Sequence, residues 1–304
     1  MFIKKGRLMR NLNPINYVSS TIHSSDVDRV FGASWQLLGP TSRLTNRGDY
    51  IAVEIAGNKV FAVRTKDGLQ AFRNVCRHRG ARLLPEGTGH CTTIRCPYHQ
   101  WVWGEDGSLL NVPWWGDDPD FNKSDWALDT VELYEWRGFL FASLSPEMPL
   151  EDQLGALVSE IEDEPIERYK WVHEERLVFD ANWKIYTDNF VEGYHIPGIH
   201  PKFHSAIEFE KFETIALEGM VKMTAPPREE LFYRGKWLWM WPNWTLSLFD
   251  GGMNTSRINP INHHQTELIY NFYFEDISEN NAPKRAKIIA DNLEVIREDF
   301  EICV

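Results

Sequence analysis

The sequence predicts an α+β protein with two domains, a small all-β domain followed by a larger domain that combines helices with an antiparallel sheet. Its 304 residues are enough for two domains of roughly 150 residues each. Short strand-like segments separated by turn signals fill the first half, and helical patterns appear in the second. Two prolines and an acidic stretch at 151–164 separate the halves. We therefore expect one domain at 35–145, a second at 146–304, and an N-terminal segment, 1–34, that packs on the second.

Turn signals between strands define the first domain. Gly57-Asn58 separates the β-rich segments Tyr50–Ile55 and Val60–Arg64 and predicts a hairpin. A further strand is expected at Leu69–Asn74, and an apolar strand at Arg137–Leu144 closes the domain. Such a frame presents functional side chains on rigidly held loop tips.

The second domain is predicted from helical spacing and from runs of Trp and Tyr. Apolar residues within 151–164 recur at the spacing of an amphipathic helix with an acidic, solvated face. Further helices are expected around Trp183–Tyr194 and from Pro283, which suits a first helical turn, to the end of the chain. Strand-like segments at 176–180 and 231–274 supply the sheet.

Charge and cysteine content restrict the partners. The formal net charge of −12 argues against nucleic acid, because phosphate binding needs a basic face. No secretory signal is visible, and no apolar run approaches the roughly twenty residues of a membrane span. Cys91 and Cys303 lie far apart in the sequence, so we expect free thiols in a reducing compartment. These features predict a cytoplasmic protein that binds neither a membrane nor nucleic acid.

Two short motifs predict a metal centre in the first domain. Each pairs one thiol with one imidazole: Cys76 with His78, and Cys96 with His99. A [2Fe–2S] centre in which two histidines replace two cysteines on one iron needs this ligand set. Tetrahedral zinc accepts the same four residues and is the alternative.

His195 and His200 predict a second metal site. His195 is expected near the end of a helix that Pro197-Gly198 stops, and His200 returns from the following turn. Two imidazoles and one carboxylate, with positions left open, form the facial triad of non-haem Fe(II) oxygenases.

The last helix supplies the predicted carboxylate, Asp299. At 100° per residue it falls on an apolar face, among Ile288, Val295, Ile296, Ile302 and Cys303. A carboxylate there is costly to bury without a metal or a counter-charge. A structural pairing of Asp299 with an Arg or Lys is the alternative. Glu192, three residues before His195, and Asp188, a turn further back, are candidates to orient a ligating imidazole.

With both sites in view, the chain resembles the large (α) subunit of Rieske non-haem iron oxygenases. The loops Cys76–Ala81 and Cys96–Trp101 are similar to the two cluster-binding loops of Rieske proteins. The resemblance implies a Rieske [2Fe–2S] domain, then a helix-grip (START-like) catalytic domain with mononuclear Fe(II). It also implies that Cys76 and Cys96 hold one iron of the cluster, and His78 and His99 the other.

The family implies partners as well. A reductase or ferredoxin supplies electrons, O₂ is a substrate, and the subunits form a homotrimer in which a carboxylate bridges a cluster histidine to an iron-ligating histidine. Glu192 occupies that bridging position, and its Glu-x-x-His form is similar to the branch that acts on quaternary ammonium compounds. The chain departs from the family pattern in two places. Gln100 stands where a glycine is usual, which we expect to alter the loop, and the chain ends five residues after Asp299, which suggests a shortened last helix.

The predicted function is a terminal oxygenase component that hydroxylates or oxidatively demethylates a small molecule with electrons from NAD(P)H. Trp237, Trp239 and Trp241 alternate on one strand and so share a face, which fits a cation–π cage for a quaternary ammonium substrate. They also fit a flat aromatic substrate or a plain core. The alternatives are an aromatic-ring-hydroxylating dioxygenase α subunit and a Rieske electron carrier without mononuclear iron.

Overall fold

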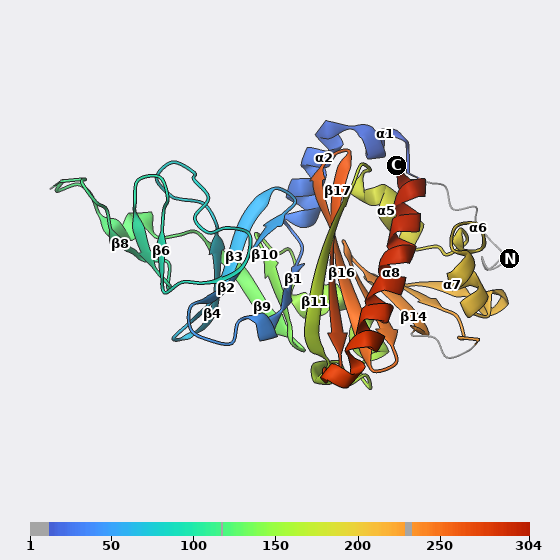
Figure 1. Cartoon of the computed structure of the whole chain (residues 1–304). Helices are drawn as coiled ribbons and strands as arrows, with labels where there is room; N and C mark the ends of the chain where they lie inside the picture. Colours follow the sequence, from blue (N-terminus) through green and yellow to red (C-terminus); the bar gives the residue numbers. More distant parts are fainter. Residues whose placement is uncertain (1–11, 117, 229–232) are drawn as a thin grey trace. The chain divides into compact units, whose positions relative to one another are not determined.

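The computed structural model describes residues 12–116, 118–228 and 233–304 (Figure 1). These residues group into two compact units. One unit is Phe31–Glu147, here called the β unit. The other joins Met148–Val304 to the described residues up to Val30 and is here called the α+β unit. In the described part of the chain, no helix is both long and apolar enough to span a membrane.

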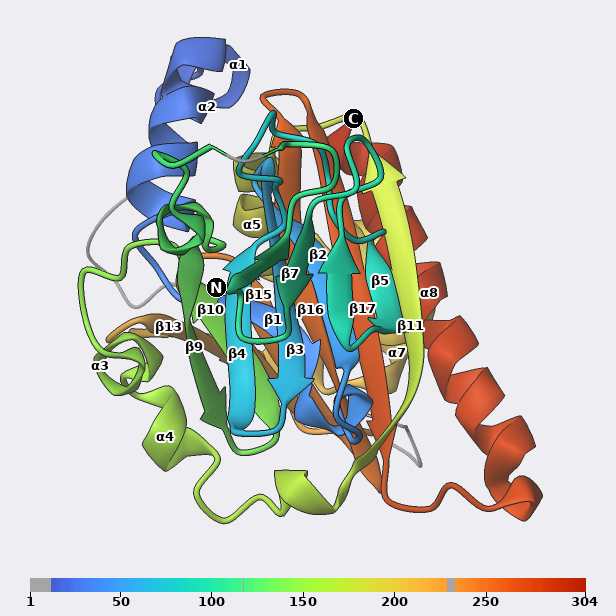
Figure 2. The ribbon, with the colours of Figure 1, turned by 90° about the vertical axis from the view of Figure 1, so that its left-hand side faces the viewer.

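The β unit contains a seven-stranded sheet and a three-stranded sheet. The seven strands lie in the order β1 (Gln36–Pro40), β10 (Phe139–Ser143), β9 (Thr130–Trp136), β4 (Gly68–Arg73), β3 (Asn58–Thr65), β2 (Asp49–Ile55) and β5 (Gly87–His90). The smaller sheet is β6 (Thr93–Arg95), β7 (Val102–Gly104) and β8 (Leu109–Asn111). Figure 1 labels β6 and β8, and Figure 2 labels β7. Buried aromatic and aliphatic side chains, including Phe61, Phe72 and Trp103, fill the space against this smaller sheet.

The first hairpin turns one residue earlier than predicted. Ile55 pairs with Asn58, so the turn residues are Ala56 and Gly57. Both have positive φ, 46° and 84°, as a type I′ turn requires. Asn58 is therefore the first residue of β3 and not part of the turn.

A seven-stranded antiparallel sheet forms the α+β unit. Its strands lie in the order β11 (Lys170–Phe179), β17 (Gln265–Phe274), β16 (Gly252–Asn262), β15 (Trp244–Phe249), β14 (Tyr233–Met240), β13 (Met220–Thr224) and β12 (Glu213–Leu217). The long helix α8 (Ala282–Cys303) runs along one face of this sheet, and α5 (Trp183–Phe190) packs on both α8 and β16 (Figure 1). The predicted start of the last helix at Pro283 agrees with α8.

Two predicted helices are interrupted by glycines. The helix expected within 151–164 is split into α3 (Leu150–Leu154) and α4 (Leu157–Glu160). Gly155 between them has φ of 50°, and a Cβ there would lie 2.6 Å from a backbone oxygen. The helix expected to reach Tyr194 ends at Phe190, because Gly193 adopts φ of 80° against the ring of Phe212.

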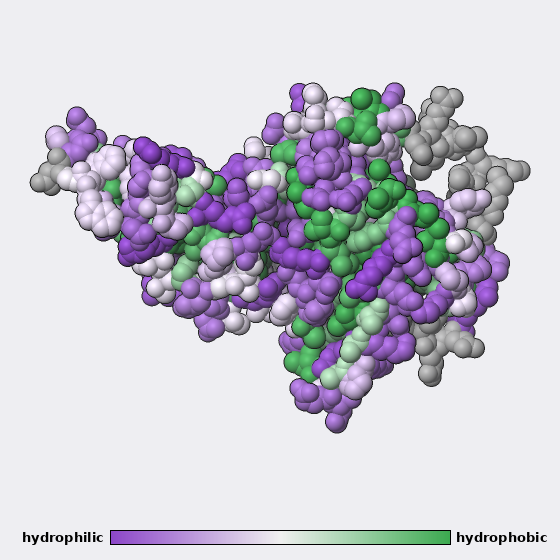
Figure 3. All heavy atoms as spheres, turned by 45° about the horizontal axis from the view of Figure 1, so that its top comes forward, coloured by the Kyte–Doolittle hydropathy of each residue, from purple (hydrophilic) through white to green (hydrophobic). Residues whose placement is uncertain are grey.

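One residue predicted on the apolar face of the last helix is exposed. Ile302 is 57% exposed, whereas Ile288, Ile296, Asp299 and Cys303 are buried as expected. More generally, hydrophobic residues reach the surface mainly on the α+β unit in the view of Figure 3, between hydrophilic ones. The buried stripe of α8 is therefore narrower than the sequence pattern indicates.

The N-terminal helices α1 (Ile15–Val18) and α2 (Ser20–Asp26) contact α5. Tyr17 donates a hydrogen bond to Asp188 at 2.5 Å, and Lys184 forms an ion pair with Asp26. These contacts fix the helix that leads into the predicted iron site.

Candidate active site with two metal centres

Two loops of the same backbone form carry the Cys/His motifs. In each loop the cysteine N–H donates to the carbonyl five residues later, at 2.8 Å from Cys76 to Ala81 and at 2.9 Å from Cys96 to Trp101. In each loop the cysteine carbonyl also accepts a bond from four residues later. The two thiols and the two imidazoles are thus presented by a pair of equivalent turns.

Gln100 does not alter its loop, contrary to expectation. Its φ is 59°, close to the 71° of Gly80 at the equivalent position of the other loop. Gln100 N–H still donates to the Cys96 carbonyl at 3.2 Å. The residue therefore tolerates the left-handed conformation that a glycine adopts more easily.

The four side chains fit a buried iron–sulfur cluster. Cys76 and Cys96 are 4% and 1% exposed, and burial raises the pKa of the Cys76 thiol. The ring centroids of His78 and His99 lie 4.8 Å apart, and the His78 ring stacks on Trp101. Nδ1 of His78 is buried without a hydrogen-bond partner among the described residues. An unsatisfied buried nitrogen and two buried thiols, carried by two equivalent loops, have the chemistry of a metal-ligand set.

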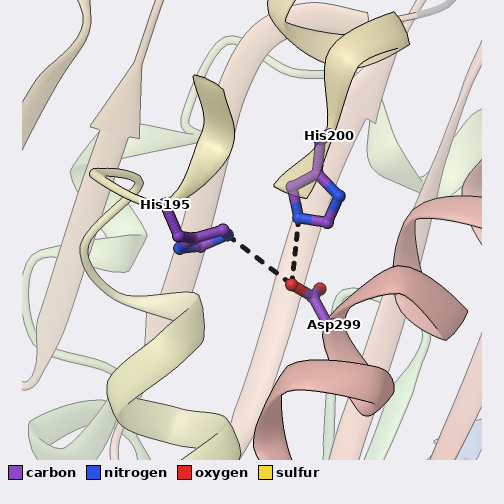
Figure 4. Close-up of side chains that lie close together, drawn as sticks. All are labelled: His195, His200 and Asp299. Atoms are coloured by element: carbon purple, nitrogen blue, oxygen red, sulfur yellow. Dashed lines mark hydrogen bonds and ion pairs between the residues drawn. The ribbon is translucent and has the colours of Figure 1, made fainter. Parts of the chain in front are cut away.

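His195, His200 and Asp299 meet in the α+β unit (Figure 4). Their candidate ligand atoms all lie within 4.8 Å of one another. Nε2 of His200 is 3.0 Å from Asp299 Oδ1, and Nε2 of His195 is 3.5 Å from the same oxygen. His200 and Asp299 are 1% and 7% exposed. The set is therefore a buried two-histidine, one-carboxylate triad.

The chain brings these ligands together from three elements. His195 precedes α6 (Ile196–Ile199) as its N-cap residue and does not lie on α5, because the backbone turns at Gly193. His200 precedes α7 (Pro201–Ala206), and Asp299 lies in the last turns of α8. The two histidines lie close together, as the sequence predicts, but His195 does not lie on the helix expected to carry it.

Other polar side chains surround the triad. Nδ1 of His195 bonds to Glu192, and Nδ1 of His200 lies 2.7 Å from Glu298. Asn189 donates to Asp299 Oδ1 at 2.8 Å. Burial acts to lower the pKa of His200, but the hydrogen bonds and charges of Asp299 and Glu298 outweigh it and raise that pKa. This excess of carboxylates around two imidazoles suits a divalent cation.

Of the two carboxylates expected to orient a ligating imidazole, Glu192 contacts His195, whereas Asp188 bonds to Tyr17 instead. The carboxylate of Asp188 accepts from Tyr17, while the Nδ1 atoms of both histidines have other carboxylate partners. Sequence reasoning missed Asn189 and Glu298. No pattern in the sequence points to the contact of Glu298 with His200.

A cavity of about 80 Å³ adjoins the triad. Aromatic side chains form part of its wall: Tyr186, Phe190, Phe203, Phe212, Trp237 and Tyr270. Among the described residues that line it, the ionisable ones besides the triad are two tyrosines, and none is Lys or Arg. The expected cage of three tryptophans is wrong, because Trp239 packs edge-on against Trp241 outside this wall. The strand ends at Met240, so Trp241 lies beyond it and is 43% exposed.

Together, a Cys₂His₂ set on two loops of a β unit and a His₂-carboxylate triad beside an apolar cavity define an iron-dependent oxygenase of the Rieske type. Sequence comparison agrees with this class. Residues 34–121 match the Rieske [2Fe-2S] domain, and residues 166–226 match the catalytic domain of the ring hydroxylating alpha subunit.

Related proteins extend the match over most of the chain. The carnitine monooxygenase oxygenase subunit of Escherichia coli is 30% identical over 278 residues, which cover 85% of this chain and 73% of the relative. The chloroplastic choline monooxygenase of Amaranthus tricolor is 26% identical over 303 residues, 94% of this chain and 68% of that enzyme. A crystal structure of the quaternary ammonium Rieske monooxygenase CntA superimposes with a TM-score of 0.86 at 26% identity, covering 95% of this chain and 82% of CntA.

The chain therefore belongs to the Rieske non-haem iron oxygenases, as an oxygenase (α) subunit. It is an oxidoreductase with a Rieske [2Fe–2S] cluster and a mononuclear iron, and it depends on a reductase, O₂ and a small substrate. The presence of the catalytic domain excludes the alternative of a Rieske electron carrier without mononuclear iron.

Proposed function

We propose that this oxygenase subunit oxidises an N-methyl group of a quaternary ammonium compound. The observation that carries the proposal is the cavity beside the triad, whose aromatic wall contains no Lys or Arg among the described residues. Aromatic faces attract a quaternary ammonium group, with each contact worth about 0.5–2 kcal/mol. The choline and carnitine monooxygenases among the relatives are named for substrates of this class.

The reaction balances with two electrons from NAD(P)H through the reductase. One atom of O₂ enters the methyl group and the other leaves as water with two protons. The hydroxymethylammonium product then loses formaldehyde and a proton, so that a tertiary amine remains. When bound, the cluster supplies single electrons and the mononuclear iron supplies the oxidising chemistry with O₂.

Within this proposal the ligands have defined roles. Cys76, Cys96, His78 and His99 hold the cluster in the domain at 35–145. His195, His200 and Asp299 hold the mononuclear iron in the catalytic domain at 146–304. Of the segment 1–34, residues 12–30 pack on this domain, and residues 1–11 lie outside the described residues. Asp299 lies in a hydrogen-bonded setting that fits a ligand, since both Nε2 atoms and the Asn189 amide converge on its Oδ1.

Glu192 is proposed as the bridge to a neighbouring subunit in a cytoplasmic homotrimer. One oxygen of its carboxylate bonds to His195, yet the side chain is 42% exposed. Tyr194 beside it is 91% exposed. A carboxylate that holds a ligating imidazole and still reaches the surface suits a link to a cluster histidine of another copy.

A substrate panel tests the proposed function. The reconstituted enzyme, with a reductase and NADH, is offered choline, carnitine, glycine betaine, benzoate and naphthalene. We expect NADH oxidation coupled to equimolar formaldehyde with at least one ammonium compound and none with the aromatic compounds. Diol or phenol formation from benzoate or naphthalene, with no formaldehyde from the ammonium compounds, would overturn it.

The bridging role has a separate test. Glu192→Gln should keep the iron content and the visible spectrum of the cluster but reduce the rate at which a reduced cluster is reoxidised in the presence of substrate and O₂. Glu160→Gln, far from the triad in the sequence and ion-paired with Lys222, is the control. Wild-type coupling and rate in Glu192→Gln would show that the bridge is not required.

A further inference from the structure

Two asparagines line the same cavity as the iron ligands. Asn254 lies on β16 and Asn292 on α8, and they are 2% and 4% exposed. They are polar groups in a wall that is otherwise mainly aromatic and aliphatic. Buried amides of this kind need hydrogen-bond partners.

The hydrogen bonds of the pair fix the orientation of both amides. Nδ2 of Asn292 donates to the carbonyl of Ile288 at 2.8 Å, and a carbonyl can only accept. Oδ1 of Asn292 therefore faces Asn254, whose Nδ2 donates to it at 3.0 Å. This order leaves Oδ1 of Asn254 as the remaining acceptor of the pair.

Oδ1 of Asn254 has no donor among the described residues and is buried. An unsatisfied buried acceptor is unfavourable, and here it belongs to a side chain in the substrate cavity. A substrate that brings a hydroxyl group would satisfy it, whereas one that brings a methyl group in the same place would leave it unpaired. A site of this kind discriminates strongly against the analogue that lacks the donor.

We propose that Asn254 selects quaternary ammonium substrates that carry a hydroxyl group, by accepting a hydrogen bond from that group at Oδ1. The proposal rests on the proposed function and names the substrate class more narrowly. The aromatic wall receives the ammonium group, and Asn254, held by Asn292, reads the hydroxyl.

Matched substrate pairs test it. Choline is compared with n-propyltrimethylammonium, and carnitine with γ-butyrobetaine, which lack the hydroxyl group but keep the ammonium group. With the wild-type holoenzyme we expect kcat/KM to favour the hydroxyl compound of at least one pair by roughly 10- to 100-fold. Calorimetric titration of the anaerobic holoenzyme should give the same order in Kd.

Variants locate the effect. Asn254→Leu is close in shape and removes the acceptor, so both ratios should fall to near one. Thr255→Val is the matched control, because Thr255 is the next residue on β16. Its hydroxyl is also buried without a partner among the residues that the structure describes, but Thr255 does not line the cavity. This control should keep the wild-type ratio. Iron content and the cluster spectrum verify that each variant is folded and loaded.

The outcomes separate the two proposals. If the wild type processes and binds both members of each pair equally well, selection by Asn254 is overturned while the proposed function stands; this comparison needs no variant. A preference that survives in Asn254→Leu also overturns it. If the enzyme accepts none of the four compounds and also yields no formaldehyde from glycine betaine, the proposed function fails, and this inference fails with it.

Discussion

Nδ1 of His200 lies 2.7 Å from a carboxylate oxygen of Glu298, while Nε2 of the same ring faces Asp299. A carboxylate only accepts, so Glu298 would hold the proton on Nδ1 when Nε2, the nitrogen that faces Asp299, binds a metal. Its neighbour in sequence is the proposed ligand Asp299, so one turn of α8 sets both the ligand and the orientation of a second ligand.

Removal of this carboxylate should weaken the mononuclear iron site. We expect Glu298→Ala to lower metal affinity about 10- to 100-fold, because partners that orient a ligating histidine have effects of this size. The measurement is Fe(II) retained after dialysis against a graded series of chelator concentrations. Glu294→Ala, on the same helix but paired with the exposed Lys202, should retain iron like the wild type. Equal retention by both variants would show that Glu298 does not support the site.

Asp299 can be predicted from the sequence and Glu298 cannot. A carboxylate on the apolar face of a helix needs a metal or a counter-charge, and helical periodicity alone places Asp299 on that face. Glu298 lies on the same helix at the boundary between the apolar and the polar face. At such a position, the sequence pattern does not distinguish a buried carboxylate from an exposed one. Only the position of α7, which no local pattern determines, brings His200 to it.

The predicted cage of three tryptophans is wrong because it, too, depends on contacts between segments that are distant in the sequence. Alternation correctly predicted that Trp237 and Trp239 share a face of β14, but a strand advances about 7 Å over two residues, so a cavity near one need not reach the other. Phe203 and Phe212, distant in sequence, supply rings beside Trp237 instead. Likewise, the sequence does not predict that the helix ends before Gly193. The reason for the glycine is the ring of Phe212, which lies where a Cβ of residue 193 would be and is distant in the sequence.

The equivalent positions Gly80 and Gln100 should respond to substitution in opposite directions. Both have positive φ, which costs a residue with a side chain about 1 kcal/mol more than glycine. Gln100→Gly should therefore raise stability by roughly that amount, and Gly80→Ala should lower it, since a Cβ at Gly80 meets no atom within 4 Å and only the backbone cost remains. The temperature at which the visible circular dichroism of the cluster is lost measures both. If Gln100→Gly and Gly80→Ala shift this temperature in the same direction, the two loops are not equivalent.

Acid should weaken the contact that joins the small sheet of the β unit to the β3 and β2 region. Glu105, next to the end of β7, accepts bonds from Arg47 at 2.9 and 3.0 Å and from the Lys66 N–H at 3.1 Å. The hydrogen bond from Arg47 is the main cause that lowers the pKa of Glu105 below its ordinary value. A lowered pKa in the folded state adds stability above the unfolded pKa, about 4.3, and that stability is lost as the pH falls toward the folded value.

Glu105→Gln tests this dependence. The variant should be less stable than the wild type at neutral pH, and the difference should shrink as the pH falls below about 4.3. Urea unfolding over a pH series, followed by the cluster signal, gives the difference at each pH. The exposed Glu132 on β9 serves as a control, because Glu132→Gln should change the stability at neutral pH only slightly. If the free energy of unfolding of Glu105→Gln differs from that of the wild type by the same amount at every pH, the carboxylate charge of Glu105 does not contribute to stability.

Trp237 and Trp241 should differ in their effect on substrate, although the sequence pattern treats them alike. Trp237 lines the cavity, with the Phe203 ring 5.2 Å and the Phe212 ring 6.4 Å from it, centroid to centroid. Loss of one cation–π contact of about 0.5–2 kcal/mol corresponds to a roughly 2- to 30-fold rise in Kd. Trp237→Leu should raise the Kd of a quaternary ammonium substrate within this range, whereas Trp237→Phe should recover part of the affinity.

Trp241→Leu removes an exposed ring outside the cavity wall and should leave the Kd unchanged. Anaerobic calorimetry on the loaded enzyme measures all three variants, and a neutral analogue in which carbon replaces nitrogen separates charge recognition from packing. If Trp237→Leu weakens the charged and the neutral compound equally, Trp237 contributes packing and shape to the cavity but no attraction for the cation.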